Sequence, residues 1–273
     1  MSTRRERAST TGEDAASGRT GARSFLHSGN AGDLIYGLPT VRALGGGDLY
    51  LGVGDHPQWG HRAALPPAYA ESLLPLLSAQ SYVTSVSVHQ GEPVDHDLDR
   101  FREHEAQAPN LAAAHLRAFG LPEEACEAPW LTVAEPLRIA DSPVLFSRTT
   151  RYRNPAFDWG HLVARYGSRA LFVGLPEEHR LFEEELGRVP YHPTRDLLEL
   201  ARLIAGCELF VGNQSAPYAI AEGLKVETIL EVCPEHDNCL FDRPGQPWGV
   251  QRAHRGVAFA CGSGLPRPLM IGT

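Results

Sequence analysis

Short apolar runs and longer segments with helical spacing of apolar positions alternate along this chain, with glycine-containing or polar turns between them. The first half predicts strands at 24–27, 49–54 and 83–89 and helices at 34–44, 69–80 and 110–120. The second half repeats the order, with strands at 143–147, 170–174, 208–212 and 227–232 and helices at 161–167, 177–187, 196–207 and 218–224. Strands that alternate with helices of this length favour parallel sheets joined by right-handed crossovers.

The two halves predict an α/β protein with two Rossmann-like lobes. We expect the first lobe over residues 24–135 and the second over 136–273, joined by a proline-rich and acidic stretch at 122–143. Residues 1–23 contain no aliphatic side chain larger than alanine apart from Met1, so they cannot bury enough apolar surface to offset the entropy lost on ordering. We predict that they form a disordered leader, and their acidic residues argue against a basic targeting peptide.

The composition is that of an ordinary globular protein, with 42% hydrophobic and 21% charged residues in a chain of 273. Acidic residues outnumber basic ones by 33 to 25, and the resulting formal charge of −8 opposes stable binding to duplex nucleic acid. Every apolar run falls short of the roughly 18 residues that span a bilayer. We therefore predict a cytoplasmic protein without a transmembrane segment.

The cysteine and histidine spacings do not predict a metal site. The five cysteines are an odd number without the paired CxxC spacing of a zinc site, and none of the 12 histidines belongs to an HExxH pattern. Cys233 and Cys239 flank His236, and we interpret them as partly buried structural thiols in a reducing compartment. We predict neither a metal nor another cofactor.

The first loop with candidate chemistry runs from Ser28 to Asp33 and contains Gly29, Asn30 and Gly32. Ligands of open parallel sheets bind at the carboxyl ends of strands, where helix N-termini attract anions. The glycines allow close backbone approach, and Asp33 is a candidate general base, although the loop lacks the GxGxxG pattern of a dinucleotide site. The competing interpretation is that Asp33 only caps the following helix.

The second loop, residues 147–154, follows a predicted strand and is rich in arginine and hydroxyl side chains. Its candidate ligands for a diphosphate are Arg148, Thr149 and Arg151, because guanidinium groups make charge-assisted hydrogen bonds to phosphate oxygens. The alternative is a solvated loop whose arginines pair with surface carboxylates.

Two further strand ends carry candidate donor-binding residues. The third loop precedes a predicted helix, so that its N–H groups would converge on an anion; its candidates are Asn213, Gln214, Ser215 and Ala216. The alternative there is a capped helix start without a ligand. After the strand at 170–174 the candidates are Gly174, Glu177 and Glu178, where a glutamate could accept hydrogen bonds from ribose hydroxyls or simply stabilise a helix dipole.

These loops, in this order, resemble those of the heptosyltransferase-like glycosyltransferases of family nine, which have the two-lobed GT-B fold. Gly32 and Asp33, followed by a helix with proline and leucine, are similar to the family's N-terminal pattern. The run LFVGNQSAPYAIAEGL at 209–224 is similar to its C-terminal pattern. The resemblance spans roughly residues 24–232. Three residues stand where the family usually has aspartate, glycine and histidine, namely Gln214, Ala216 and Ala219.

The resemblance implies a glycosyltransferase that moves a sugar from a nucleotide-diphosphate sugar to an acceptor hydroxyl, with inversion and without a metal. It implies that the acceptor binds the first lobe and the donor the second, with Asp33 as the base and the second and third loops on the diphosphate. Two alternatives stay open. Gln214 and Ala219 favour a nucleotide or sugar-nucleotide binding module that has lost catalysis. A phage-type enzyme that glycosylates nucleic-acid bases is disfavoured by the acidic charge.

Overall fold

The computed structural model describes residues 22–54 and 64–242. Most of the predicted leader and the end of the predicted second lobe therefore lie outside the described residues. Arg23, which we had placed at the end of the leader, is the first residue of a strand.

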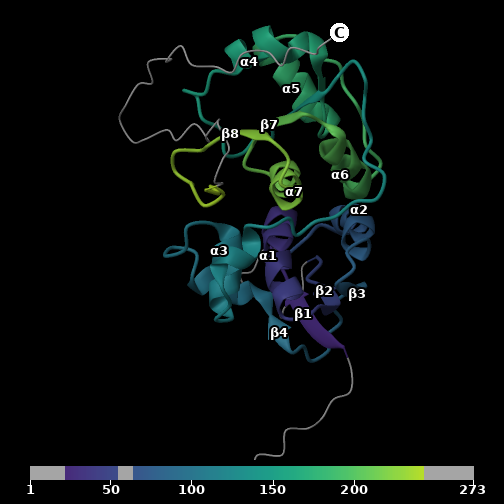
Figure 1. Ribbon diagram of the computed structural model, residues 1–273, viewed down its shortest axis with the longest axis vertical. Helices are drawn as coiled ribbons and strands as arrows, with labels where there is room; N and C mark the ends of the chain where they lie inside the picture. The colour runs from purple at the N-terminus through teal and green to yellow at the C-terminus, as the bar shows by residue number, and fades with distance from the viewer. Residues whose placement is uncertain (1–21, 55–63, 243–273) are drawn as a thin grey trace, which may run out of the picture.

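Two four-stranded sheets, both entirely parallel, form the two halves of the molecule (Figure 1). The first sheet has the order β3-β2-β1-β4 and contains β1 (Arg23–His27), β2 (Gly47–Leu51), β3 (Val83–Val88) and β4 (His96–Asp97). The second has the order β6-β5-β7-β8 and contains β5 (Val144–Ser147), β6 (Ala170–Phe172), β7 (Leu209–Asn213) and β8 (Thr228–Glu231). The predicted α/β class with parallel sheets is confirmed.

Every helix that the sequence pattern predicts is present. The α-helices are α1 (Ala31–Ala43), α2 (Pro67–Ser78), α3 (Leu111–Ala118), α4 (Trp159–Tyr166), α5 (Pro176–Leu186), α6 (Leu197–Gly206) and α7 (Ala216–Leu224). The described residues also include the 3-10 helices η2 (Leu98–Glu103), η3 (Glu123–Cys126) and η4 (Gly167–Arg169). The sequence did not predict β4 or these 3-10 helices, because none of them carries an apolar run with a recognisable period.

Side-chain caps define where several helices begin. Asn110, Asp196 and Ser215 each accept a hydrogen bond from the backbone N–H three residues further on, at the start of α3, α6 and α7. Gly120 follows the end of α3 with a φ of 65°, a left-handed conformation that favours glycine. These local signals explain why the predicted helix boundaries agree with the structure within a few residues.

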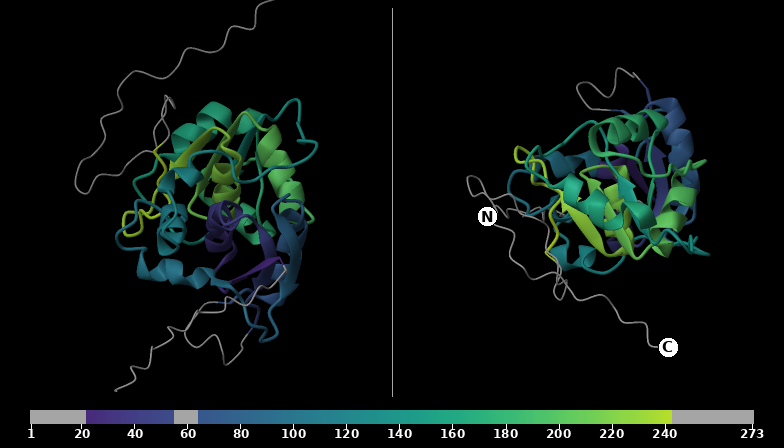
Figure 2. Two further views of the ribbon diagram at one scale, coloured as in Figure 1. Left: turned by 60° about the horizontal axis from the view of Figure 1, so that its bottom comes forward. Right: turned by 90° about the horizontal axis from the view of Figure 1, so that it is seen from above.

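Helices α1 and α7 pack against each other at the centre of the molecule, and α2 packs against α6 beside them (Figures 1 and 2). The apolar core is continuous across this contact, from Phe25 on β1 of the first sheet to Phe210 on β7 of the second. The connecting chain is tied to α7 because the Trp130 and Leu131 N–H groups both donate to the Gly223 carbonyl, at 2.9 and 3.0 Å. The two sheets are thus held in one arrangement by packing and backbone hydrogen bonds.

Candidate functional site

The first and third predicted loops meet where α1 and α7 begin. A Cβ atom added to Gly32 would lie 3.8 Å from the Ala216 nitrogen, an ordinary van der Waals distance, so the two helix ends lie next to each other. Each helix start carries N–H groups without an intrahelical acceptor and the positive end of the helix dipole. The fold therefore places two positive helix ends, one from each lobe, at one junction.

Asp33 lies at this junction, half-buried in the first turn of α1. Its Oδ2 accepts a hydrogen bond from the Asn30 N–H at 3.3 Å, so part of the predicted capping role is present. Burial raises the pKa of the Asp33 carboxyl, and the nearby Arg102 and Arg151 guanidinium groups oppose that rise. Asp33 is therefore a partly desolvated carboxyl that faces cationic groups from both lobes.

Arg102 is a cationic residue at the junction that the sequence did not reveal. A Cβ atom added to Gly29 would lie 3.1 Å from Arg102 Nη2 and 3.1 Å from Asp33 Oδ2, so guanidinium and carboxylate approach the same glycine. Arg102 is exposed, and its guanidinium lies over the Phe101 ring at 4.7 Å. It lies in η2, away from the three loops we singled out, which is why strand-end reasoning missed it.

Arg148 does not lie at the junction but in a buried ion-pair network. Its Nε and Nη2 donate to the two carboxylate oxygens of Glu231 at 2.8 and 2.9 Å, and its Nη1 donates to Glu185 at 2.7 Å. Glu231 is fully buried and also accepts from Trp159 Nε1 at 2.8 Å. Because two carboxylates occupy the guanidinium of Arg148, this placement argues against the predicted contact with a diphosphate. Arg148 instead fixes the shape of the second loop.

Asn213 and Thr149 likewise bind each other. Asn213 is fully buried, and its Oδ1 accepts from the Thr149 N–H at 2.9 Å. Its Nδ2 donates to the carbonyl oxygens of Thr149 and Arg151, at 3.3 and 2.5 Å. These bonds hold the second loop against the third and leave the exposed Arg151 side chain as the cation that the loop presents.

Gln214 connects the two lobes through a chain of polar side chains. Its Oε1 accepts from the Cys233 N–H at 2.7 Å, and its Nε2 lies 3.5 Å from Asn238 Oδ1. Asn238 in turn donates from Nδ2 to Glu105 of the first lobe at 2.8 Å. Gln214 is buried, so this side chain has a structural role.

Ser215 is the N-cap of α7. Its Oγ accepts from the Tyr218 N–H at 3.5 Å and donates to the Asn213 carbonyl at 2.9 Å. The capped helix start that we considered as the alternative is thus present, and it leaves the half-buried Ser215 and Ala216 at the edge of the junction.

The strand end after β6 brings Gly174 and Glu178 together. Gly174 has a φ of 147°, and a Cβ atom there would lie 2.9 Å from Glu178 Oε2. Glu178 accepts from the Leu175 N–H at 3.0 Å, while burial raises the pKa of its carboxyl and Arg151 opposes the rise. Glu177 is exposed in the first turn of α5. Arg151 is therefore within electrostatic reach of both Asp33 and Glu178.

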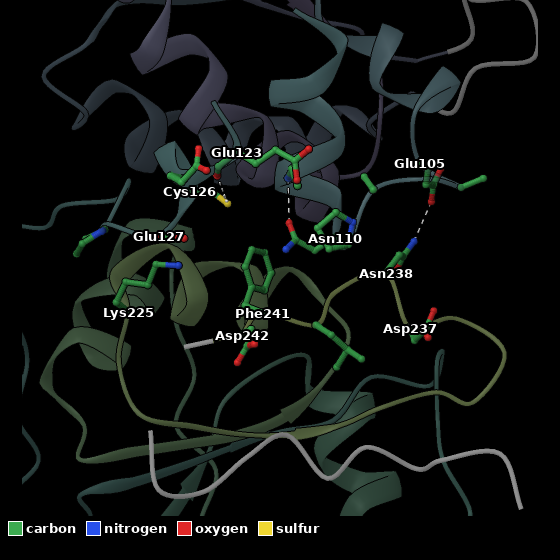
Figure 3. Close-up of a pocket in the computed structure, with 17 residues that line it drawn as sticks. Glu105, Asn110, Glu123, Cys126, Glu127, Lys225, Asp237, Asn238, Phe241 and Asp242 are labelled. Carbon is green, nitrogen blue, oxygen red and sulfur yellow. Dashed lines mark hydrogen bonds between the residues drawn. The ribbon is translucent and has the colours of Figure 1, made fainter. Parts of the chain in front are cut away.

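A cavity of about 1070 Å³ lies beside the junction, between α3 and η3 on one side and residues 237–242 on the other (Figure 3). Its acidic lining residues are Glu105, Glu123, Glu124, Glu127, Asp237 and Asp242. Among the described residues of the lining, Lys225 is the single lysine or arginine. The negative electrostatic potential of these acidic residues repels a diphosphate, so an anion is better suited to the arginine-flanked junction than to this cavity.

Within residues 22–54 and 64–242, no three histidine, cysteine, aspartate or glutamate side chains gather as metal ligands. The four cysteines in these ranges are free thiols, and burial raises the pKa of Cys239 to about 12 and that of Cys126 to about 11. In the same part of the chain, no helix combines the length and apolar character needed to cross a membrane.

Neither a family model nor a curated protein matches the sequence. Among solved structures, the chain is similar to the iron-containing dodecameric glycosyltransferase TibC from enterotoxigenic E. coli H10407, with a TM-score of 0.56 and 14% identity. That match covers 87% of this chain and 64% of TibC. TibC in complex with ADP-D-beta-D-heptose matches with a TM-score of 0.51 and 12% identity, over 82% of this chain and 61% of that one.

A family 9 glycosyl transferase from Veillonella parvula DSM 2008 also matches, with a TM-score of 0.46 and 12% identity, over 77% of this chain and 80% of that one. This chain spans less than two thirds of the length of TibC. At such identities the likeness to TibC shows the fold. The chain shares the two-lobed α/β fold of the glycosyltransferase TibC, in agreement with the fold that the sequence resemblance led us to expect.

Proposed function

We propose that the protein is a heptosyltransferase-like glycosyltransferase that moves a sugar from a nucleotide-diphosphate sugar to an acceptor hydroxyl, with inversion and without a metal ion. The observation that carries the proposal is the junction of α1 and α7, where Asp33 is within electrostatic reach of an arginine of each lobe, Arg102 and Arg151. The fold supports the same class, since TibC, which is described in complex with ADP-D-beta-D-heptose, shares it.

The diphosphate binds at the start of α7 beside Arg151. The start of α7 supplies the Ala216 N–H, which has no intrahelical acceptor, and the positive end of the helix dipole, and Arg151 supplies a full charge on an exposed side chain. The buried network beneath, in which Asn213 binds the backbone of residues 149 and 151, keeps this cation in place. Positive charge from these groups stabilises the departing diphosphate without a metal.

Asp33 acts as the general base. The acceptor oxygen forms a bond to the anomeric carbon, the bond from that carbon to the diphosphate oxygen breaks, and the acceptor proton moves to the Asp33 carboxylate. A single displacement of this kind inverts the configuration at the anomeric carbon. The raised pKa of Asp33 suits the role, because a desolvated carboxylate is a stronger base. Glu178 is the candidate partner for the donor's ribose hydroxyls.

A nucleotide-binding module without catalysis is the second candidate. It is favoured by Gln214, whose amide is occupied by the Cys233 N–H and Asn238 at a position where the resembling family usually has a carboxylate. In this alternative, the junction would bind a nucleoside diphosphate in the same place but release it unchanged.

The test of the diphosphate site compares one variant with a matched control. Arg151→Gln should weaken the affinity for ADP or UDP in calorimetry by about 10-fold or more, since it removes a charge-assisted contact. Arg180→Gln, which alters an exposed arginine on α5, should leave the affinity unchanged. Both measurements are made with and without EDTA. A strict requirement for a divalent ion would refute the metal-independent site.

Asp33→Asn separates the enzyme from the binding module. The nucleotide affinity should not weaken, because the change removes a negative charge and no donor contact, while turnover of an ADP-sugar, read as transfer to an acceptor or as slow hydrolysis, should fall by about 10²- to 10⁴-fold. Unchanged turnover would eliminate Asp33 as the base. Nucleotide binding without any turnover by the wild-type protein would favour the binding module.

A further inference from the structure

Two buried histidines touch each other directly behind the first loop. His27 is the last residue of β1 and His115 lies on α3; both are fully buried, and their Nε2 atoms are 3.2 Å apart. The Phe101 ring stacks on His115 at 4.0 Å and on His27 at 5.9 Å. Gly37 in the middle of α1 leaves room for the pair, because a Cβ atom there would lie 3.2 Å from His115 Cδ2.

The hydrogen-bond partners fix where each proton resides. His27 Nδ1 accepts from the Gly29 N–H at 2.9 Å, so the neutral ring carries its proton on Nε2. That proton is donated to His115 Nε2, and the remaining His115 proton, on Nδ1, is donated to the Leu111 carbonyl at 2.8 Å. This is the single arrangement of two neutral rings in which all three bonds have one donor and one acceptor. Burial lowers the pKa of both histidines, in agreement with neutral rings.

This chain of bonds ends at the backbone of the first loop. Besides the Gly29 N–H, held by His27, the Ser28 N–H donates to Asp99 Oδ1 at 3.1 Å, and the Ser28 hydroxyl donates to Asp99 Oδ2. Gly29 has no space for a side chain, since a Cβ atom would lie 2.5 Å from His27 Cε1. The next residue, Asn30, is the N-cap of α1, and Asp33 lies in the first turn.

We propose that His27, oriented by His115, is a positioning residue that sets the path of the first loop and thereby the place of Asp33. The inference rests on the proposed function, in which Asp33 is the base. His27 acts through the Gly29 N–H and touches no substrate. An acceptor at His27 Nδ1 pulls that N–H inward, and the turn into α1 then presents the Asp33 carboxylate to the junction.

Two substitutions at the same position separate positioning from packing. In His27→Asn the side-chain oxygen takes the place of Nδ1 and still accepts from the Gly29 N–H. In His27→Gln the amide reaches toward the place of Nε2 and His115, which leaves the Gly29 N–H without an acceptor. Both variants lose the ring, so a purely structural role predicts similar melting temperatures and similar activity.

We expect His27→Asn to keep kcat within about 3-fold of the wild type and His27→Gln to lower kcat by about 10- to 100-fold. The donor KM should be unchanged in both variants, because a displaced base slows the chemical step without weakening donor binding. The Gly29 amide should also exchange its hydrogen at least about 10-fold faster in His27→Gln than in His27→Asn. This second measurement needs no substrate. If the protein shows no transfer but the exchange rates differ, the proposed function fails and the positioning role stands.

A second comparison covers the case in which a His27 variant does not fold. His115→Gln offers an amide oxygen to the His27 Nε2–H, whereas His115→Leu offers none. Slower Gly29 exchange and higher kcat in His115→Gln than in His115→Leu are expected. Equal exchange rates and equal kcat within each pair would overturn the proposal.

Discussion

Acidification should destabilise this protein through its buried histidine pair. Burial and the Arg102 charge lower the pKa of His27 from 6.5 to about 3, and burial lowers that of His115 well below its ordinary value. The carboxylate of Asp99 faces the pair and Arg102 lies nearby, so charges of both signs surround it. The folded protein therefore holds both rings neutral at a pH where the unfolded chain protonates them.

The size of the effect follows from proton linkage. As the pH falls below 6.5 the unfolded chain binds a proton at His27, and the folded protein does not do so until about pH 3. The free energy of unfolding therefore decreases with falling pH, by about 1.4 kcal/mol per pH unit within this window. Between pH 7 and pH 5 the loss is about 2 kcal/mol for His27, and His115 adds to it in the same direction.

Urea unfolding at pH 7, 6 and 5 measures this slope. The double variant His27→Asn/His115→Gln lacks both titrating rings. Its unfolding free energy should therefore decrease less between pH 7 and pH 5 than that of the wild type, and the two decreases should differ by at least about 2 kcal/mol. Asp33 and Glu178 act with the opposite sign, because carboxyls whose pKa is raised stabilise the fold as they protonate. They are present in both proteins and cancel in the difference. The reasoning would be refuted if the unfolding free energies of the wild type and the double variant decreased equally between pH 7 and pH 5.

Two further predictions concern stability at neutral pH. Glu231→Gln should lower the free energy of unfolding by about 3 to 5 kcal/mol, because it leaves the buried Arg148 guanidinium without its main partner. The control is Glu184→Gln, which breaks the exposed pair with Arg180 and should lower the free energy of unfolding by less than about 1 kcal/mol. Similar losses in denaturant unfolding would contradict the structural role of Arg148. Gly46→Ala should lower the melting temperature more than Gly120→Ala: both glycines have positive φ, but a Cβ atom at Gly46 would lie 2.1 Å from the Tyr82 carbonyl oxygen and none is close at Gly120.

Most of the fold was predictable because its signals are local. The strands around Phe25 and Phe146 are short apolar runs between turns, and helices such as α3 begin at a capping asparagine and end before Gly120. These features depend on residues within a few positions of one another. Strand β4 was not predicted, because it consists of two polar residues, His96 and Asp97, which form the edge of the sheet by pairing with β1.

The roles of individual site residues were less predictable because they depend on distant partners. Arg148 and Arg151 lie in the same loop and have the same chemistry, yet one is buried against Glu231 and the other is exposed at the junction. A signal for the first was present, since a glutamate at the end of an apolar strand must find a cationic partner when it is buried. Arg102 and His27 gave no such signal, as their roles arise from the approach of η2 and α3 to the first loop.

The amide at Gln214 bears on the balance between catalysis and binding. A carboxylate there, as in the resembling family, would place a negative charge beside the start of α7, where the proposed diphosphate binds. The buried amide removes that charge and uses its two ends to join the Cys233 N–H to Asn238, whose own amide donates to Glu105 of the first lobe. The field at the helix end is thereby more positive, and the two lobes are more firmly connected. If the diphosphate binds at the start of α7 as proposed, the absence of this negative charge strengthens the binding of a nucleoside diphosphate, including the product of transfer, so product release is the step that this departure should slow.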